Sequence, residues 1–384
     1  MSLVVDEHRQ YLEDRVRVSA FRRAIAETVN PGDAVLDLGC GTGILGLLAC
    51  EAGAKRVYSI DEGGMAQLAR DIAHANHFDD RISVIKGLST RIVLPEQADV
   101  VIADQIGRFG FDAGVLEYFA DAQRRLLKPS GRSIPARIDL WVAPVEHAAQ
   151  WKKIDFWSHR PAGFAFEPAH AIAQNTGYPV NLQPRHLLGD PIQGTTLDAL
   201  TQGGKPIAFS AAMRTDRAGT LHGIGGWFSA QLSPGVEMTN SPLAKRRIKR
   251  RNVLFPIAQA LAVARGDRVN VSFSILPQDL IVTWKVEMHP ATGRKRGTDP
   301  VVRFTHSTLK GMLISREDLT HTDPQSIPVM SVWGKARQTV LELCDGKRTL
   351  KQIEDGVLLG HPELFATRAE AAVFAAEVIT RYAQ

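Results

Sequence analysis

The sequence predicts an α/β protein whose N-terminal part is a Rossmann-like domain with a parallel, doubly wound sheet. Over residues 34–140, short apolar runs alternate with helical patterns, as in chains that build parallel sheets. A glycine-rich turn, Gly39-Cys-Gly-Thr-Gly43, directly follows the first apolar run, Ala34–Leu38. The next run, Arg56–Ile60, is followed by the acid Asp61. These features are typical of a β-α-β unit that binds a ligand at the carboxyl ends of its strands.

The other elements of this domain follow in order. A helical pattern over Glu7–Ile25 precedes the first strand. After the glycine turn we expect helices over Ile44–Ala52, Gly64–Asn76 and Gly114–Leu126, and strands over Arg56–Ile60, Arg81–Ile85, Ala98–Ala103 and Ser133–Leu140. Residues that directly follow strands are Gly41, Asp61, Ser89 and Asp104. Since parallel strands end at one edge of a sheet, we expect these four residues to meet in one crevice. We place this domain at residues 1–143.

The glycine turn favours a nucleoside-type ligand, and its details favour S-adenosylmethionine (SAM) over NAD. Glycines allow the backbone to approach the ligand, and Asp61 would accept hydrogen bonds from ribose hydroxyls. The dinucleotide pattern G-x-G-x-x-G would require a glycine where this chain has Ile44. Asp37 suits the cationic methionine end of SAM, directly or through water. We therefore expect SAM to contact Asp37, Gly39, Gly41, Gly43 and Asp61.

The composition agrees with a soluble enzyme of two or three domains. The chain has 384 residues, 44% of them hydrophobic, and a formal net charge of +5. Its cysteines, Cys40, Cys50 and Cys344, are scattered, so we expect neither a disulfide framework nor a metal site. We see no secretory signal and no apolar run long enough to span a membrane. We therefore expect a cytoplasmic protein.

The order of motifs resembles the protein arginine methyltransferases. The segment His8-Arg-Gln-Tyr-Leu-Glu-Asp-Arg-Val-Arg17 matches that family's H-x-x-M-L-x-D-x-x-R helix in register, with Tyr11 in place of the Met. Further matching segments are 36–45, 52–55, 85–87, 94–95 and 134–137, and the pattern continues to about residue 310. The resemblance implies that Arg17 binds the SAM carboxylate, for which its bidentate fork is suited. We also expect SAM contacts for His8, Glu62, Leu88 and Ser89, although the family's adenine-side acid after Gly87 is missing here and Ser89-Thr90 stands in its place.

The loop after the fourth strand departs from the family pattern. There the family carries two glutamates that clamp the substrate guanidinium. This chain keeps Asp104 and Gly107 of the first half, and its second acid, Asp112, comes one position early. We expect Asp104 to be the catalytic acid, with Asp112 second. Either both acids hold a cation against the SAM methyl group, or one is a general base and the other is solvated.

A basic run, Lys245-Arg-Arg-Ile-Lys-Arg-Arg251, stands where the family has a Thr-His-Trp loop. Six cations in seven residues would repel an arginine substrate and attract an acidic peptide, a carboxylate or a phosphate. We therefore expect Arg247, Lys249 and Arg250 to bind substrate together with Gly107. The alternatives are a solvated loop at a dimer edge or, less favoured, a nucleic-acid site, since aromatic residues for base stacking are lacking nearby.

Two further regions complete the predicted organisation. Residues 144–315 read as an antiparallel β-barrel for substrate binding and dimerisation, with a helical arm at about 154–190 and a second basic turn, Gly293–Gly297. In the arm, Phe156, Trp157, Phe164 and Phe166 are either interface anchors of a homodimer or buried core. After a linker at 316–330, residues 331–384 predict a small, mainly helical module.

This C-terminal module contains the element L-x-L-C-D-G-x-R-T-L-x-x-I at residues 341–353. The element resembles small winged-helix modules that bind leader peptides. The alternative is a helical cap that covers the end of the barrel.

Taken with the resemblance, these features predict a SAM-dependent methyltransferase that acts on a protein or peptide side chain, with an acidic or leader-bearing peptide as one candidate. The alternatives are a SAM-binding scaffold without activity, or a methyltransferase for an anionic small molecule or nucleic acid.

Overall fold

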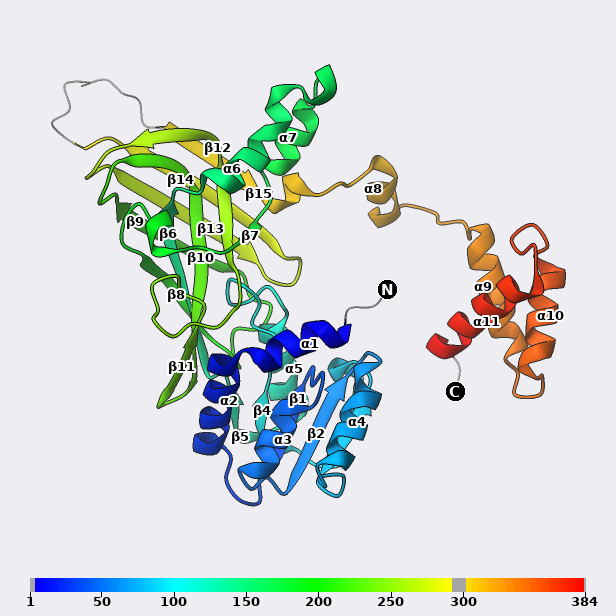
Figure 1. Cartoon of the computed structure of the whole chain (residues 1–384). Coiled ribbons are helices and arrows are strands. Elements are labelled where there is room, and N and C mark those ends of the chain that lie inside the picture. Colours follow the sequence, from blue (N-terminus) through cyan, green and yellow to red (C-terminus); the bar gives the residue numbers. More distant parts are fainter. Residues whose placement is uncertain (1–3, 292–301, 383–384) are drawn as a thin grey trace. The chain divides into compact units, whose positions relative to one another are not determined.

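The computed structural model describes residues 4–291 and 302–382 of the chain. Two units, residues 1–312 and 313–384, are distinguished by their internal contacts (Figure 1), and each is described by itself. The predicted basic turn Gly293–Gly297 lies outside the described residues. Among the described residues, no helix has the length and hydrophobicity needed to cross a lipid bilayer.

A five-stranded parallel sheet forms the N-terminal part of the first unit, as predicted. Its strands are β1 (Ala34–Leu38), β2 (Arg56–Asp61), β3 (Ile82–Lys86), β4 (Ala98–Ile102) and β5 (Leu127–Ile134). They lie in the order β3-β2-β1-β4-β5, and every pair is parallel. All five residues of β1 are buried, as expected for a central strand of a parallel sheet. From β1, the chain adds β2 and β3 on one side and then β4 and β5 on the other. The topological switch point therefore lies between β1 and β4, and a ligand crevice is expected at the carboxyl ends of these two strands.

Helices connect these strands, also as predicted. They are α3 (Ile44–Glu51), α4 (Met65–Ala75) and α5 (Val115–Arg125), with a short 3₁₀ turn η1 (Ser89–Arg91). Helix α5 buries Val115, Phe119 and Ala122 on one face, which is the spacing of an amphipathic helix.

The N-terminal helix differs from the prediction of one helix over residues 7–25. Two helices, α1 (Val4–Glu13) and α2 (Arg15–Thr28), meet at Asp14. Asp14 has non-helical backbone angles and caps α2, because its carboxylate accepts a hydrogen bond from the Arg17 backbone N–H at 3.2 Å. Figure 1 shows α1 above the parallel sheet, toward the antiparallel strands, and α2 alongside the sheet. The break therefore lets α1 lie over the parallel sheet while α2 packs beside it.

The strand predicted over Ser133–Leu140 is likewise two strands. Strand β5 begins at Leu127, directly after the predicted helix and six residues before the predicted strand, and β6 (Arg137–Val145) begins after Pro135 and Ala136. Proline has no N–H to donate, which favours an interruption of the ladder here. Strand β6 pairs with β10 and β8 of an antiparallel sheet, so the predicted domain boundary at residue 143 falls inside this strand.

Two antiparallel sheets form the rest of the first unit, which confirms the barrel-like second part of the fold. Their orders are β7-β12-β10-β6-β8, with β11 beside β10, and β15-β14-β13-β9. The strands not yet given are β7 (Tyr178–Val180), β8 (Ile192–Asp198), β9 (Ile207–Arg214), β10 (Gly219–Ser233), β11 (Val236–Thr239), β12 (Asn252–Val263), β13 (Arg268–Leu276), β14 (Ile281–His289) and β15 (Val302–Ser307). Alternate residues of β9 are buried, as in a sheet with one face on the core.

The predicted helical arm consists of α6 (Ala148–Asp155), α7 (Glu167–Ala173) and the 3₁₀ turns η2 (Phe156–His159) and η3 (Pro161–Gly163). Its aromatic residues divide into two kinds. Phe156 and Phe164 are 51% and 69% exposed, whereas Trp157 and Phe166 are half-buried. The Trp157 ring lies between two others, with centroid distances of 5.3 Å to Phe156 and 5.8 Å to Phe166. Two short 3₁₀ turns, η4 (Pro184–His186) and η5 (Thr308–Gly311), complete this unit.

The second unit is helical, as predicted. It contains α8 (Arg316–Thr322), inside the expected linker, and α9 (Val332–Leu343), α10 (Leu350–Gly360) and α11 (Arg368–Tyr382). Thr349 caps α10 in a capping box with Gln352. Helices α9, α10 and α11 share one core that includes Val340, Val357 and Phe374. The described residues of this unit contain no strand, so the winged-helix resemblance is not confirmed.

Candidate active site

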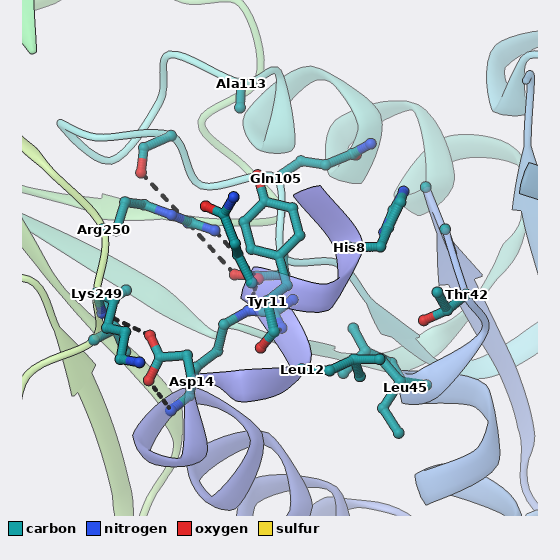
Figure 2. Close-up of a pocket in the computed structure, with 18 of the residues that line it drawn as sticks. His8, Tyr11, Leu12, Asp14, Thr42, Leu45, Gln105, Ala113, Lys249 and Arg250 are labelled. Carbon is teal, nitrogen blue, oxygen red and sulfur yellow. Dashed lines mark hydrogen bonds and ion pairs between the residues drawn. The ribbon is translucent and has the colours of Figure 1, made fainter. Parts of the chain in front are cut away.

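A cavity of about 490 Å³ lies at the carboxyl ends of β1 and β4, where the strand order reverses. Four segments line it: the α1–α2 corner, the turn after β1, the loop after β4, and residues 248–251 ahead of β12. Figure 2 shows His8 and Thr42 on one side of the cavity and Lys249 and Arg250 on the opposite side. The structure therefore brings the predicted cofactor turn, acidic loop and basic run to one place.

The glycine turn has a backbone that only glycine readily adopts. Gly39 and Gly41 have φ angles of +62° and +54°. A Cβ atom at Gly39 would lie 2.0 Å from Nε2 of Gln105, and one at Gly41 would lie 2.4 Å from Cε1 of His8. Both glycines thus permit a group in the cavity to approach the backbone closely, as SAM binding would require. Gly43, with φ of +77°, instead precedes α3 and faces Ala69 of α4.

Asp61, at the end of β2, is held by two backbone N–H groups. Its Oδ2 accepts from Gly41 at 3.0 Å and its Oδ1 accepts from Gly63 at 2.8 Å. The carboxylate is thereby fixed beside the glycine turn, where it suits a ribose. Glu62 and Leu88 are exposed, and the Ser89 carbonyl oxygen accepts a hydrogen bond from Arg125. These three residues lie after β2 and β3, outside the cavity lining, and their SAM contacts stay predictions. Asp61 also lies outside the lining, so of the four residues expected in one crevice only Gly41 and Asp104 line this cavity.

Asp37 lies in β1 and is fully buried. One of its carboxylate oxygens accepts a hydrogen bond from the Gly46 N–H of α3 at 3.1 Å. Burial raises the pKa of this carboxyl group to about 7, since desolvation disfavours the charged form. Asp37 therefore ties β1 to α3 behind the turn, and it would act on SAM by its charge.

Asp104 follows β4 and binds two guanidinium groups. Its Oδ2 accepts from Nε of Arg17, and Arg250 donates to both oxygens, from Nη2 to Oδ2 at 3.3 Å and from Nη1 to Oδ1 at 3.5 Å. The side chains are only 8–15% exposed, so solvent screens these ion pairs weakly. The arrangement shows that the shortened acidic residue still binds guanidinium. Arg17, predicted to bind the SAM carboxylate, lines the same cavity.

Asp112 has a different environment. Its Oδ1 accepts hydrogen bonds from the backbone N–H groups of Arg108 and Phe109 at 2.7 and 2.8 Å. Gly107, with φ of +80°, lies so close that a Cβ there would be 2.2 Å from the same oxygen. Asp112 and Gly107 line the cavity, and together they fix the shape of the loop that carries Asp104.

The basic run divides into anchored and exposed residues. Ile248 is buried, Arg247 donates to the carbonyl oxygen of Leu182 at 2.9 Å, and Arg250 binds Asp104. Four cations of the run are exposed: Lys245, Arg246, Lys249 and Arg251. Lys249 and Arg250 line the cavity as predicted, whereas Arg247 lies outside its lining. The substrate roles of these residues stay predictions.

Two further residues of the cavity had no assigned role in the sequence analysis. Asp14 joins α2 to the basic run, because its Oδ2 accepts from the Lys249 backbone N–H at 2.6 Å. The helical pattern of the sequence continues across Asp14, which hides its role as an N-cap. Gln105, whose side chain lies over Gly39, has no local signal, since its neighbour is distant in sequence.

Comparison with known proteins agrees with this geometry. The family model of ribosomal protein L11 methyltransferase (PrmA) matches residues 22–138, and the arginine methyltransferase oligomerization subdomain matches residues 136–307. Protein arginine N-methyltransferase 1 of Dictyostelium discoideum is 28% identical over 281 residues, covering 71% of this chain and 82% of that protein. Arabidopsis thaliana PRMT10 is 28% identical over 301 residues, covering 68% and 78%.

Solved structures show the same fold. The structure of Arabidopsis thaliana protein arginine methyltransferase 10 has a TM-score of 0.67 at 24% identity and covers 78% of this chain and 97% of its own. The Trypanosoma brucei PRMT1 enzyme-prozyme complex with AdoHcy has a TM-score of 0.69 at 20% identity, with the same coverage. The chain is a SAM-dependent methyltransferase that is similar in sequence and fold to protein arginine methyltransferases.

Proposed function

We propose that this enzyme transfers the methyl group of SAM to the guanidinium of an arginine side chain in a protein or peptide. The observation that carries the proposal is Asp104, which binds two guanidinium groups in the cavity that the glycine turn also lines. The names of the relatives, protein arginine N-methyltransferases, support the same acceptor.

Each residue of the site has a proposed role that follows from its position. Gly39 and Gly41 would admit SAM, Asp61 would bind its ribose, and Arg17 its carboxylate. SAM supplies a methyl group activated by a sulfonium. Asp104 would hold the acceptor guanidinium close to that methyl group and take the proton that the nitrogen releases. Positioning of this kind removes much of the entropic barrier of a two-reactant step.

An acidic peptide is less well supported than the sequence suggested. The basic run uses Arg247 and Arg250 inside the protein. The charged residues that line the cavity are Arg17, Arg108, Lys249, Arg250 and Arg251, against Glu13, Asp14, Asp104 and Asp112. Five cations against four acids do not make a strongly positive site. The exposed cations remain available for acidic residues that flank an acceptor arginine.

The test uses SAM with an isotopically labelled methyl group and proteins of a cell lysate. We expect label in methylated arginine after acid hydrolysis, and none with Asp104→Asn. Label that mild base releases as methanol would instead identify a carboxylate acceptor and contradict the proposal. Transfer to nucleic acid or to small molecules alone would contradict it as well.

We also propose that the enzyme forms a homodimer through the arm. The match to an oligomerization subdomain and the exposed rings of Phe156 and Phe164 support this assignment. Light scattering of the wild type should give twice the mass of the chain, and Phe164→Ser should shift it toward the monomer. A monomeric wild type would contradict the proposal. The cytoplasmic location and the peptide-binding role of the C-terminal unit stay predictions.

A further inference from the structure

Arg250 binds Asp104, the residue that we propose to hold the acceptor arginine. Its guanidinium contacts both oxygens of Asp104 and also donates to the carbonyl oxygen of Gly107, at 3.4 Å. Both partners belong to the loop after β4, which would orient a substrate. Figure 2 shows the Arg250 side chain extending from the basic run into the cavity. We infer that Arg250 is itself an acceptor, and that the enzyme methylates this residue within its own chain.

The backbone around Arg250 is anchored, so this placement does not depend on a loose loop. The Lys249 N–H donates to Asp14, and the Ile248 N–H donates to the Thr239 carbonyl at 3.0 Å. The Arg251 carbonyl accepts from the Asn240 side chain at 3.1 Å. With both neighbours fixed, the Arg250 side chain is directed at Asp104, and the entropic cost of bringing acceptor and acid together is already met by folding.

Arg17 and Arg247 do not have this combination of contacts. Arg17 binds Asp104 through Nε, and its Nη1 donates to the Tyr11 carbonyl oxygen, which leaves it suited to hold the cofactor. Arg247 is held at Leu182 and lies outside the cavity lining. Only Arg250, among these three, presents both terminal nitrogens to the acidic loop.

The reaction is the proposed transfer with an internal acceptor, so the inference rests on the proposed function. The bond between the SAM sulfur and its methyl carbon breaks, and a bond forms between that carbon and a terminal nitrogen of Arg250. The sulfur keeps the electron pair and becomes the neutral thioether of S-adenosylhomocysteine. The nitrogen gives one proton to Asp104 and then to solvent. The guanidinium keeps its charge, and it has one N–H donor fewer for Asp104.

The experiment needs no external substrate. The purified full chain is incubated with SAM carrying a labelled methyl group and then cleaved after glutamates, which releases the segment between Glu237 and Glu287. We expect label on Arg250 of this segment, at an initial rate per chain that dilution does not change. Arg250→Gln should lose the label. Arg246→Gln removes the same charge from an exposed position of the run and should keep it.

Mass spectrometry of the wild type shows whether Arg250 is methylated even if Arg250→Gln folds poorly. Label confined to another residue, or a rate that rises with protein concentration, would overturn the inference. An unlabelled Arg250 in an enzyme that methylates arginine in lysate proteins would overturn it while the proposed function stands. If a chain that binds SAM labels neither Arg250 nor lysate proteins, both this inference and the proposed function are wrong.

Discussion

The two walls of the cavity are built from different parts of the chain. The cofactor wall, by which we mean the turn Gly39–Gly43 together with Asp61, presents mainly backbone groups; Gly43 and Asp61 lie outside the cavity lining, and the Asp61 carboxylate is fixed by two backbone N–H groups. The acceptor wall, which comprises Asp104–Asp112 and residues 248–251, presents charged side chains that bind one another. A wall of backbone is determined by the fold, whereas a wall of side chains can change with single substitutions. The family resemblance is therefore more informative about the cofactor than about the acceptor.

The largest effect is expected on the acceptor wall, from Asp104→Asn. The amide keeps the size of the side chain but has neither the charge nor the basicity of the carboxylate. Methyl transfer should fall by about 10²–10⁴-fold, the range typical of a lost general base. The affinity for SAM should fall less than the rate, and only through Arg17, which loses its ionic partner Asp104.

Asp112→Asn is the matched control for this variant. Its Oδ1 accepts two backbone N–H bonds in the loop, and an amide oxygen can still accept them. Transfer rates and calorimetric SAM titrations measure both variants. A large loss of SAM affinity in Asp104→Asn with an unchanged maximal rate would show that the two walls are not separate.

The second prediction addresses the cofactor wall through Asp61→Asn. Hydrogen bonds to a charged group contribute about 1.5–3 kcal/mol, so the Kd for SAM should rise roughly 10- to 100-fold. The rate at saturating SAM should change little, because the acceptor wall is intact. Asp71→Asn, an exposed position in α4, serves as the control. Unchanged SAM affinity in Asp61→Asn would remove Asp61 from the site.

The contrast between a wall of backbone groups and a wall of side chains also explains which features the sequence could predict. Strand β1 and helix α5 follow from hydrophobic pattern, and the turn at Gly39–Gly43 follows from glycines that need positive φ. The pairing of Arg250 with Asp104 joins segments 146 residues apart and leaves no local pattern. The helix break at Asp14 was missed because the apolar spacing continues across it. Charge counting over the basic run could not foresee that Arg247 and Arg250 have partners inside the protein.

The third prediction concerns the pH dependence of SAM binding. Burial raises the pKa of Asp37 to about 7 in the free enzyme, and the sulfonium of SAM would favour the ionised carboxylate. SAM binding would then release a proton, so its Kd should fall as pH rises toward 7, by at most about tenfold per pH unit, and level off above. S-adenosylhomocysteine has no sulfonium and should show a flatter profile. Identical calorimetric profiles for both ligands would exclude this role for Asp37.

The smallest effect is expected from Arg247→Gln, which tests how the acceptor wall is supported. Arg247 donates to the Leu182 carbonyl oxygen at 2.9 Å, and Leu182 is buried. Loss of this hydrogen bond should lower the free energy of unfolding by about 1 kcal/mol, as for a typical intramolecular bond, while KM for the acceptor stays unchanged. Arg246→Gln removes the same charge from an exposed position and should alter neither the free energy of unfolding nor KM. Denaturant unfolding and steady-state kinetics measure both variants. If Arg247→Gln instead raises KM without loss of stability, Arg247 contacts the substrate after all, and the acceptor wall extends further along the basic run than the cavity lining shows.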